Sequence, residues 1–257
     1  MTATEPDWRS VWITGASSGI GLELAKMIGA HSDHVAISAR SEDRLKAASA
    51  DYDTLHAYPL DVTDAPAVSA CVAEIEEKTG GIDVAILNAG AWTLMTVDEY
   101  DLAAVRKGVE VNYMGVMHAL EALLPRMLSR GKGHIVLVAS VAGYRGLPLS
   151  LAYGPTKAAL INLAETLACE LGPRGIKVSL VNPGFVDTPM TRDNPFPMPG
   201  LMSVKKAAAE CLAGLKSSSF EVRFPWAFTS AMKILRLLPN RLYFWVVRRF
   251  IHKSPAG

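Results

Sequence analysis

The chain has 257 residues, of which 50% are hydrophobic, and its formal net charge is +1 at pH 7. This length allows one large α/β domain or two small ones, and the hydrophobic content is ample for a buried core. The near-neutral charge argues against nucleic acid as the main partner, because no basic field extends over the whole domain.

Three scattered cysteines, Cys71, Cys169 and Cys211, form neither a CxxC pair nor a cluster with histidine. The sequence therefore predicts no disulfide framework and no metal site, and it favours a reducing, cytoplasmic compartment. The first ten residues are polar and lack the apolar core of a signal peptide. No uncharged apolar run approaches the roughly 18 residues that a membrane-spanning helix needs.

Short β-rich runs alternate with longer helical patterns, which predicts a doubly wound parallel sheet of about seven strands with helices on both faces. The runs VAILN and HIVLVAS are almost continuously apolar, as in strands that are buried on both faces. No linker divides the chain, so one α/β domain is predicted over residues 1–257. The expected strands are 10–14, 34–38, 55–60, 84–87, 134–139, 177–181 and 220–223, and the expected helices include 19–30, 65–79, 102–129 and 153–171.

A glycine-rich string, TGASSGIG, lies between the first expected strand and the first expected helix. Its first glycine allows a tight turn, its second lets the main chain approach a pyrophosphate, and its third lets the helix pack closely on the sheet. The N–H groups at the helix start attract phosphate. The alternative is a glycine-rich turn without a ligand, although the strand–loop–helix context is the one that a dinucleotide site requires. The expected contacts come from Gly15, Ser17, Ser18, Gly19, Ile20 and Gly21.

The second expected strand is followed by Ala39 and Arg40, at the place where an acidic residue would favour NAD. An arginine can instead pair with a 2′-phosphate, which indicates NADP (NADPH) and makes NAD the less favoured cofactor. The alternative is that Arg40 is only a solvated charge at the end of a strand.

Tyr153 and Lys157 are one helical turn apart, so they share a helix face. A nearby ammonium, together with the positive ring of an oxidised nicotinamide, would lower the pKa of the tyrosine. Such a tyrosine can give a proton to a carbonyl oxygen or take one from an alcohol. Ser140, which ends the run VLVAS, is placed to hydrogen-bond the same oxygen. Considered alone, Tyr153 with Lys157 would be interpreted as a pair on a helix surface, and Ser140 as a cap after a strand.

The order of these motifs is typical of one family: the glycine loop, then Asn88-Ala89-Gly90, then Tyr153 with Lys157. The chain resembles the classical short-chain dehydrogenases/reductases over about residues 11–188. The resemblance implies a Rossmann-type fold, a homo-oligomer (dimer or tetramer) and a relay water held by an asparagine in the string VNYMG. The catalytic residues that it implies are Asn112, Ser140, Tyr153 and Lys157. The further cofactor contacts that it implies are Asp61, Val62, Asn88, Ala89, Gly90, Tyr153, Lys157, Pro183, Gly184, Val186 and Thr188.

The string PMTRDNPFPMPGLM, which starts at residue 189, lacks periodicity, which predicts a loop over the substrate, the alternative being an ordinary surface loop. By position, Trp92, Tyr144 and Met190 are expected near the substrate. The predicted function is therefore an NADP-dependent oxidoreductase that acts on a hydrophobic carbonyl compound or secondary alcohol. The alternative is an NADP-binding regulatory or scaffold protein with little turnover.

The C-terminal stretch 222–257 carries seven lysines and arginines and no acidic residue, which leaves 19 basic against 25 acidic residues in the rest of the chain. Aromatic strings interrupt the basic residues, and Pro239 divides predicted helices 227–238 and 240–251. A basic amphipathic extension at about 226–252 is typical of peripheral membrane contact. The alternative is that these aromatic residues pack at a subunit interface or over the substrate cleft.

Overall fold

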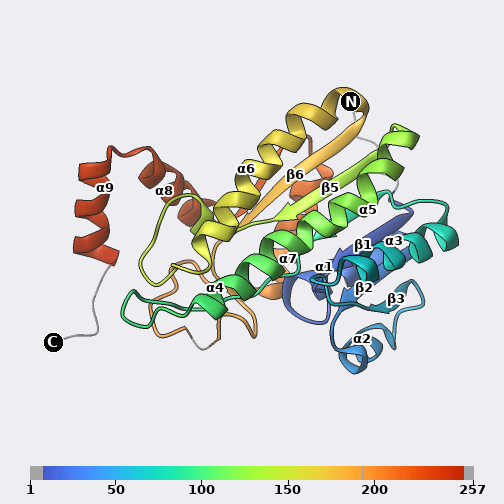
Figure 1. Ribbon diagram of the computed structural model, residues 1–257, viewed down its shortest axis with the longest axis horizontal. Helices are drawn as coiled ribbons and strands as arrows, with labels where there is room; N and C mark the ends of the chain where they lie inside the picture. The colour runs from blue at the N-terminus through green and yellow to red at the C-terminus, as the bar shows by residue number, and fades with distance from the viewer. Residues whose placement is uncertain (1–7, 193, 252–257) are drawn as a thin grey trace.

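The main sheet contains seven parallel strands in the order β3-β2-β1-β4-β5-β6-β9 (Figure 1). The computed structural model describes residues 8–192 and 194–251. The predicted sheet is confirmed, and its strand ends lie within two residues of those expected from the sequence. The strands are β1 (Ser10–Thr14), β2 (His34–Ala39), β3 (Leu55–Pro59), β4 (Val84–Leu87), β5 (Gly133–Val138), β6 (Ile176–Pro183) and β9 (Glu221–Phe224).

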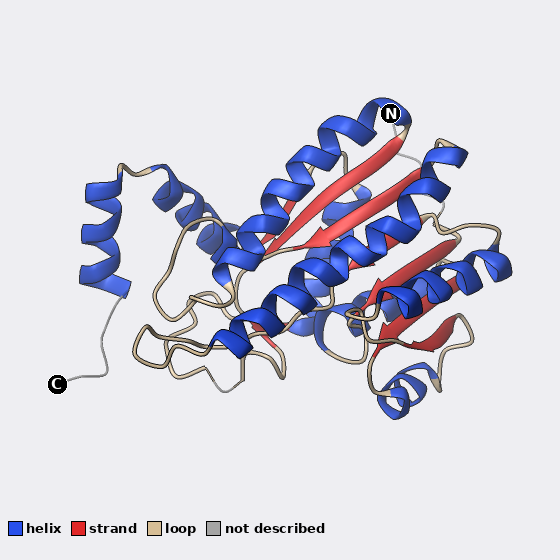
Figure 2. Ribbon diagram, viewed as in Figure 1, coloured by secondary structure: helices blue, strands red, loops and turns tan. Residues whose placement is uncertain are grey.

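Helices cover both faces of the sheet, so its central strands are buried on both sides (Figure 2). Successive side chains of a strand enter opposite layers: Trp12 packs on one face, whereas Val11 and Ile13 pack on the other. The layer of Trp12 contains α3 (Ala65–Thr79), α5 (Gly115–Arg130) and α6 (Gly154–Leu171). The opposite layer contains α1 (Gly19–Gly29), α2 (Glu42–Ser49) and α7 (Val204–Lys216).

The order of the strands reverses at β1, because β2 and β3 lie on one side of it while β4 and β5 lie on the other. The connections after β1 and β4 therefore leave the sheet in opposite directions. In open α/β sheets this reversal leaves a crevice at the carboxyl ends of the strands, where ligands bind.

The predicted helix over 102–129 is not uniform. It consists of α4 (Leu102–Val109), a π-helical turn (Glu110–Met114) and α5. A π turn holds one residue more than an α turn, and such turns occur frequently at functional sites. A second, two-stranded parallel sheet, which was not predicted, pairs β7 (Val186–Asp187) with β8 (Met202–Ser203). This pairing holds together the two ends of the segment that connects them.

The C-terminal stretch forms a helical hairpin of α8 (Trp226–Leu237) and α9 (Asn240–Val246), followed by a π-helical turn (Val247–Ile251). Figure 1 shows α9 standing clear of the sheet and its flanking helices. Pro239 separates the two helices, as predicted. Residue 252 and Lys253, which belong to the predicted basic extension, lie outside the described residues. Within residues 8–192 and 194–251, every helix is too short or too polar to cross a bilayer.

Arg145 attaches this hairpin to the body of the protein. Its guanidinium donates hydrogen bonds to carbonyl groups at the end of α8, the shortest being 2.6 Å to Leu238 O, and to Asn240 Oδ1 at 2.5 Å. The same guanidinium lies 3.8 Å from the centre of the Tyr243 ring, and the Tyr243 hydroxyl donates to the carbonyl of Gly146. A charged donor near the end of a helix is favourable, because the last carbonyl groups have no partner within the helix.

Tyr144 makes a second attachment, which differs from the substrate contact expected from its position. Its hydroxyl donates to Glu221 Oε1 at 2.5 Å, and this carboxylate also accepts from Asn182 Nδ2 at 2.9 Å and from the Lys233 ammonium of α8. Burial alone would raise the pKa of Glu221, but these three donors hold it below its ordinary value. Tyr144 therefore has a structural position between the sheet and α8 and does not line the cleft described below.

Candidate active site

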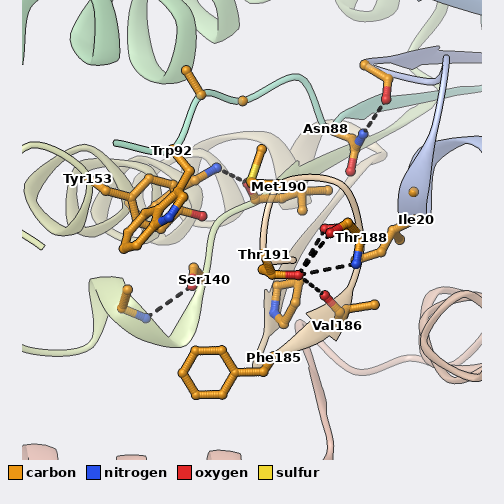
Figure 3. Close-up of a pocket in the computed structure, with 18 of the residues that line it drawn as sticks. Ile20, Asn88, Trp92, Ser140, Tyr153, Phe185, Val186, Thr188, Met190 and Thr191 are labelled. Carbon is orange, nitrogen blue, oxygen red and sulfur yellow. Dashed lines mark hydrogen bonds between the residues drawn. The ribbon is translucent and has the colours of Figure 1, made fainter. Parts of the chain in front are cut away.

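The carboxyl ends of the parallel strands surround a cleft with a volume of about 680 Å³. Part of it is shown in Figure 3. Its walls come from the loops that follow β1 to β6, from the segment 188–199 and from the C-terminal hairpin. Every predicted site residue lines the cleft except Gly21, Asn112 and Tyr144. The size lies within the range usual for ligand pockets.

The loop between β1 and α1 has the backbone that its glycines predict. Gly15 and Gly19 adopt φ values of +67° and +60°, and a Cβ atom on Gly15 would lie 2.7 Å from Ala89 Cα. Ser18 caps α1 without a side-chain hydrogen bond, and the first turn of the helix holds no acidic residue. The first N–H groups of α1 are thus not occupied by a capping side chain, and they suit a pyrophosphate.

Asn88 connects this loop to β4. Its amide Nδ2 donates to the carbonyl oxygens of Thr14 at 3.0 Å and of Gly15 at 3.1 Å. In return, the Thr14 hydroxyl accepts hydrogen bonds from the main-chain N–H groups of Asn88 and Ala89. Gly21 faces this amide from α1, since a Cβ atom there would lie only 2.6 Å from Asn88 Nδ2. Gly21 therefore acts through close packing, which explains why it does not line the cleft.

Two arginines line the cleft beyond β2, at the end away from the tyrosine. Arg40 follows the strand, and Arg44 lies in the first turn of α2. Asp61 also lines the cleft, and its pKa is below its ordinary value mainly because the Thr63 main chain donates to its carboxylate, with a smaller contribution from Arg40. Sequence reasoning missed Arg44, although its spacing of four residues from Arg40 was a signal that could have found it.

Ser140, Tyr153 and Lys157 all line the cleft, and Tyr153 lies close to both of the others. Tyr153 directly precedes α6, which begins at Gly154 and so places its proline in the first turn, where proline is tolerated. The Lys157 ammonium donates to the carbonyl of Val138 at 2.8 Å and lies 5.6 Å from the centre of the Tyr153 ring. Lys157 is only 3% exposed, so its charge is held in a poorly solvated position.

Burial acts on these two groups in opposite directions. It raises the pKa of Tyr153 to about 12, although a hydrogen bond with Ser140 opposes the shift. It lowers the pKa of Lys157 to about 8. The expected lowering of the Tyr153 pKa involved both the lysine and an oxidised nicotinamide. In the protein itself, the pKa of Tyr153 is raised instead. The phenol is protonated at neutral pH, which is the state that a proton donor needs.

Asn112 lies in the π-helical turn and is fully buried behind the cleft. Its Oδ1 accepts from the N–H of Ala91 at 2.6 Å, and its Nδ2 donates to Ala91 O and to Thr156 Oγ1, both at 3.0 Å. Both amide hydrogens are thus used to hold the β4 loop against α6. A relay water therefore cannot be held by the amide donors of Asn112.

The end of the cleft beyond Tyr153 is apolar. Trp92 packs its ring edge-on to Tyr153, with 4.8 Å between ring centres, and donates to Asn194 Oδ1 at 3.1 Å (Figure 3). Further along, Phe185 contacts Phe196 of the segment 188–199 and Phe228 of α8. The hairpin thus supplies part of this wall, a role that sequence reasoning left open. The large apolar residues at this end are Trp92, Leu147, Phe185, Met190, Phe196, Phe228, Met232 and Phe250.

Residues 9–196 match the sequence profile of the family described as short chain dehydrogenase. A Myxococcus xanthus protein described as an uncharacterized oxidoreductase is 34% identical over 249 residues, which cover 95% of this chain and 98% of the relative. A Burkholderia cenocepacia short chain dehydrogenase, solved in complex with NADP, is 25% identical with a TM-score of 0.82, and the similarity covers 96% of this chain and 99% of the other. A Burkholderia phymatum short chain dehydrogenase/reductase, solved in complex with NAD, shares the fold with a TM-score of 0.81 at 23% identity over 90% of this chain and 93% of the other.

The family profile covers most of the chain, and the parallel sheet, the glycine loop and the convergence of Ser140, Tyr153 and Lys157 agree with it. The chain belongs to the short-chain dehydrogenase/reductase family, whose members are NAD(P)-binding oxidoreductases.

Proposed function

We propose that the protein is an NADP-dependent oxidoreductase that transfers hydride between the nicotinamide and a hydrophobic carbonyl compound or secondary alcohol, with Tyr153 as the proton donor or acceptor. The observation that carries the proposal is the position of Tyr153, whose protonated phenol lies between a cationic, phosphate-binding end and an apolar end of one cleft. A regulatory protein with little turnover would not need that arrangement.

The residues at the cationic end fit a dinucleotide. The turn at Gly15 and Gly19 leaves room for a pyrophosphate at the start of α1, and Asp61 and Val62 form a wall for the adenosine. When bound, the nicotinamide supplies or accepts the hydride at the substrate carbon. The proposed contacts at that ring are Pro183, Gly184, Val186 and Thr188, which line the cleft after β6.

The proton moves at the Tyr153 hydroxyl. In the reductive direction the phenol gives its proton to the carbonyl oxygen as negative charge develops there, while the Ser140 hydroxyl hydrogen-bonds the same oxygen. The Lys157 ammonium stabilises the phenolate that remains. Asn112 acts by positioning, because it holds the main chain of Ala91 against Thr156 on α6.

The preference for NADP rests on Arg40 and Arg44, which line the same end of the cleft. A guanidinium can pair with the 2′-phosphate through charge-assisted hydrogen bonds, and NAD offers no such group. The substrate preference rests on the apolar end, where aromatic and methionine side chains surround the space beyond Tyr153. A cytoplasmic location and a dimeric or tetrameric assembly complete the proposal.

Replacing Tyr153 by phenylalanine removes the proton donor but keeps the ring that packs against Trp92. Reduction of an apolar aldehyde should slow by at least about a hundredfold, the low end for a general acid. Binding of NADPH, measured by fluorescence titration, should change little. Turnover within a few fold of wild type would show that another group supplies the proton.

The pH dependence of the reduction rate should reflect the protonation state of Lys157. The ammonium loses its proton as the pH rises through about 8, while the pKa of about 12 keeps Tyr153 protonated. The kcat/KM for NADPH, which reports groups of the free enzyme, should therefore fall above about pH 8. A Lys157→Met variant should be slow and should lack this decline. A wild-type profile that stays flat to pH 10 would contradict the role of the lysine.

NADPH should bind more tightly than NADH because of the arginine pair. Losing a charge-assisted phosphate contact costs about 1.5–3 kcal/mol, or about one to two decades of affinity. Arg40→Ala and Arg44→Ala should each reduce the ratio of NADH to NADPH dissociation constants and leave NADH binding almost unchanged. Arg174→Ala, an exposed arginine that does not line the cleft, is the matched control. A wild type that prefers NADH would overturn the assignment.

A further inference from the structure

The C-terminal hairpin exposes an unusual number of large apolar side chains. Within the described residues 226–251 these are Trp226, Ile234, Leu237, Leu242, Phe244, Trp245 and Phe250, with exposed fractions from 45% to 82%. The same range contains no aspartate or glutamate. Its exposed basic residues are Arg236, Arg241, Arg248 and Arg249.

These exposed side chains are not needed to hold the hairpin in place. The attachment uses Tyr243 and Val247, which are buried, together with the Arg145 contacts at the end of α8. Lys233, the inward basic residue of α8, is paired with Glu221. The hairpin is thus fixed by one set of residues and presents a different set outward, apart from Phe250, which also lines the cleft.

The outward side chains of α9 and the turn after it form a shallow hollow. Arg241, Arg248 and Arg249 line it together with Phe244 and Trp245. Guanidinium groups pair with phosphate oxygens, and tryptophan is favoured at the boundary between lipid headgroups and acyl chains. The hollow therefore combines recognition of a phosphate with recognition of an attached apolar chain, which is the chemistry of a phospholipid.

We propose that the α8–α9 hairpin docks on the surface of an anionic phospholipid bilayer, with its exposed aromatic and leucine side chains in the interface and its arginines on the headgroups. Basic residues without acidic neighbours complement such a surface. A two-fold contact between copies would instead bring the same basic, acid-free face of both chains together, which is electrostatically unfavourable. The inference concerns where the protein binds and goes beyond the proposed reaction.

The test is flotation of the full chain with vesicles of phosphatidylcholine mixed with phosphatidylglycerol, and with vesicles of phosphatidylcholine alone. The protein should float with the anionic vesicles at low salt, much less with the neutral ones, and less again at high salt. Changing Arg241, Arg248 and Arg249 together to glutamine should weaken anionic vesicle binding by at least about tenfold. Phe244→Ser with Trp245→Ser should weaken binding through loss of interfacial contact.

A matched control changes Arg174, Lys205 and Lys206 to glutamine, which removes the same charge from exposed positions outside the hairpin. This control should float like the wild type, and all variants should bind NADPH normally, which shows that they are folded. Wild-type protein that stays with the soluble fraction would overturn the proposal. Equal losses in the control and hairpin variants would also overturn it. A dimer that dissociates in the hairpin variants, without vesicle affinity in the wild type, would assign the face to a second copy.

Discussion

The hydrogen bonds between Asn88 and the end of β1 hold the junction on which the site depends. β1 and β4 lie side by side where the strand order reverses, and their loops must separate there to form the crevice. The Asn88 amide holds the carbonyl groups of Thr14 and Gly15, while Gly21 leaves space for that amide beneath α1. The phosphate-binding turn is thereby fixed relative to the β4 loop, and that loop is in turn held by Asn112.

Burial shifts the pKa values of two titratable groups in the cleft, Tyr153 and Lys157. A poorly solvated position disfavours charge, so it keeps Tyr153 protonated and lowers the pKa of Lys157 toward neutrality. Near neutral pH the phenol therefore keeps its proton, while the lysine titrates closer to neutrality than an exposed lysine would. The same cleft is lined by two arginines after β2 and by the large apolar side chains near Trp92. The C-terminal hairpin lines the apolar part of this cleft through Phe228 and Met232, so the position of the hairpin affects the shape of the cleft.

The sequence predicted the features that depend on local spacing. The apolar runs identified the strands, the glycine spacing identified the phosphate-binding turn, and Tyr153 and Lys157 were recognisable because a helix places them on one face. Features that depend on tertiary contacts were missed or misplaced. The π turn around Asn112 does not alter the hydrophobic periodicity of the sequence. Tyr144 points toward the carboxylate of Glu221, which is 77 residues away in the chain. Whether the hairpin lines the cleft was left open for the same reason, since the position of Phe228 depends on tertiary packing such as its contact with Phe185.

The proposed activity is hydride transfer in this cleft between a bound nicotinamide and the carbonyl carbon of an apolar substrate. The most direct measurement uses NADPH with deuterium at both C4 positions of the nicotinamide and follows the label by mass spectrometry in a panel of aliphatic and aromatic carbonyl compounds. Wild-type protein should place deuterium on the former carbonyl carbon of an apolar substrate. Hydride transfer by this protein would be ruled out for the panel if NADPH bound, as measured by fluorescence, and the label appeared in none of the products.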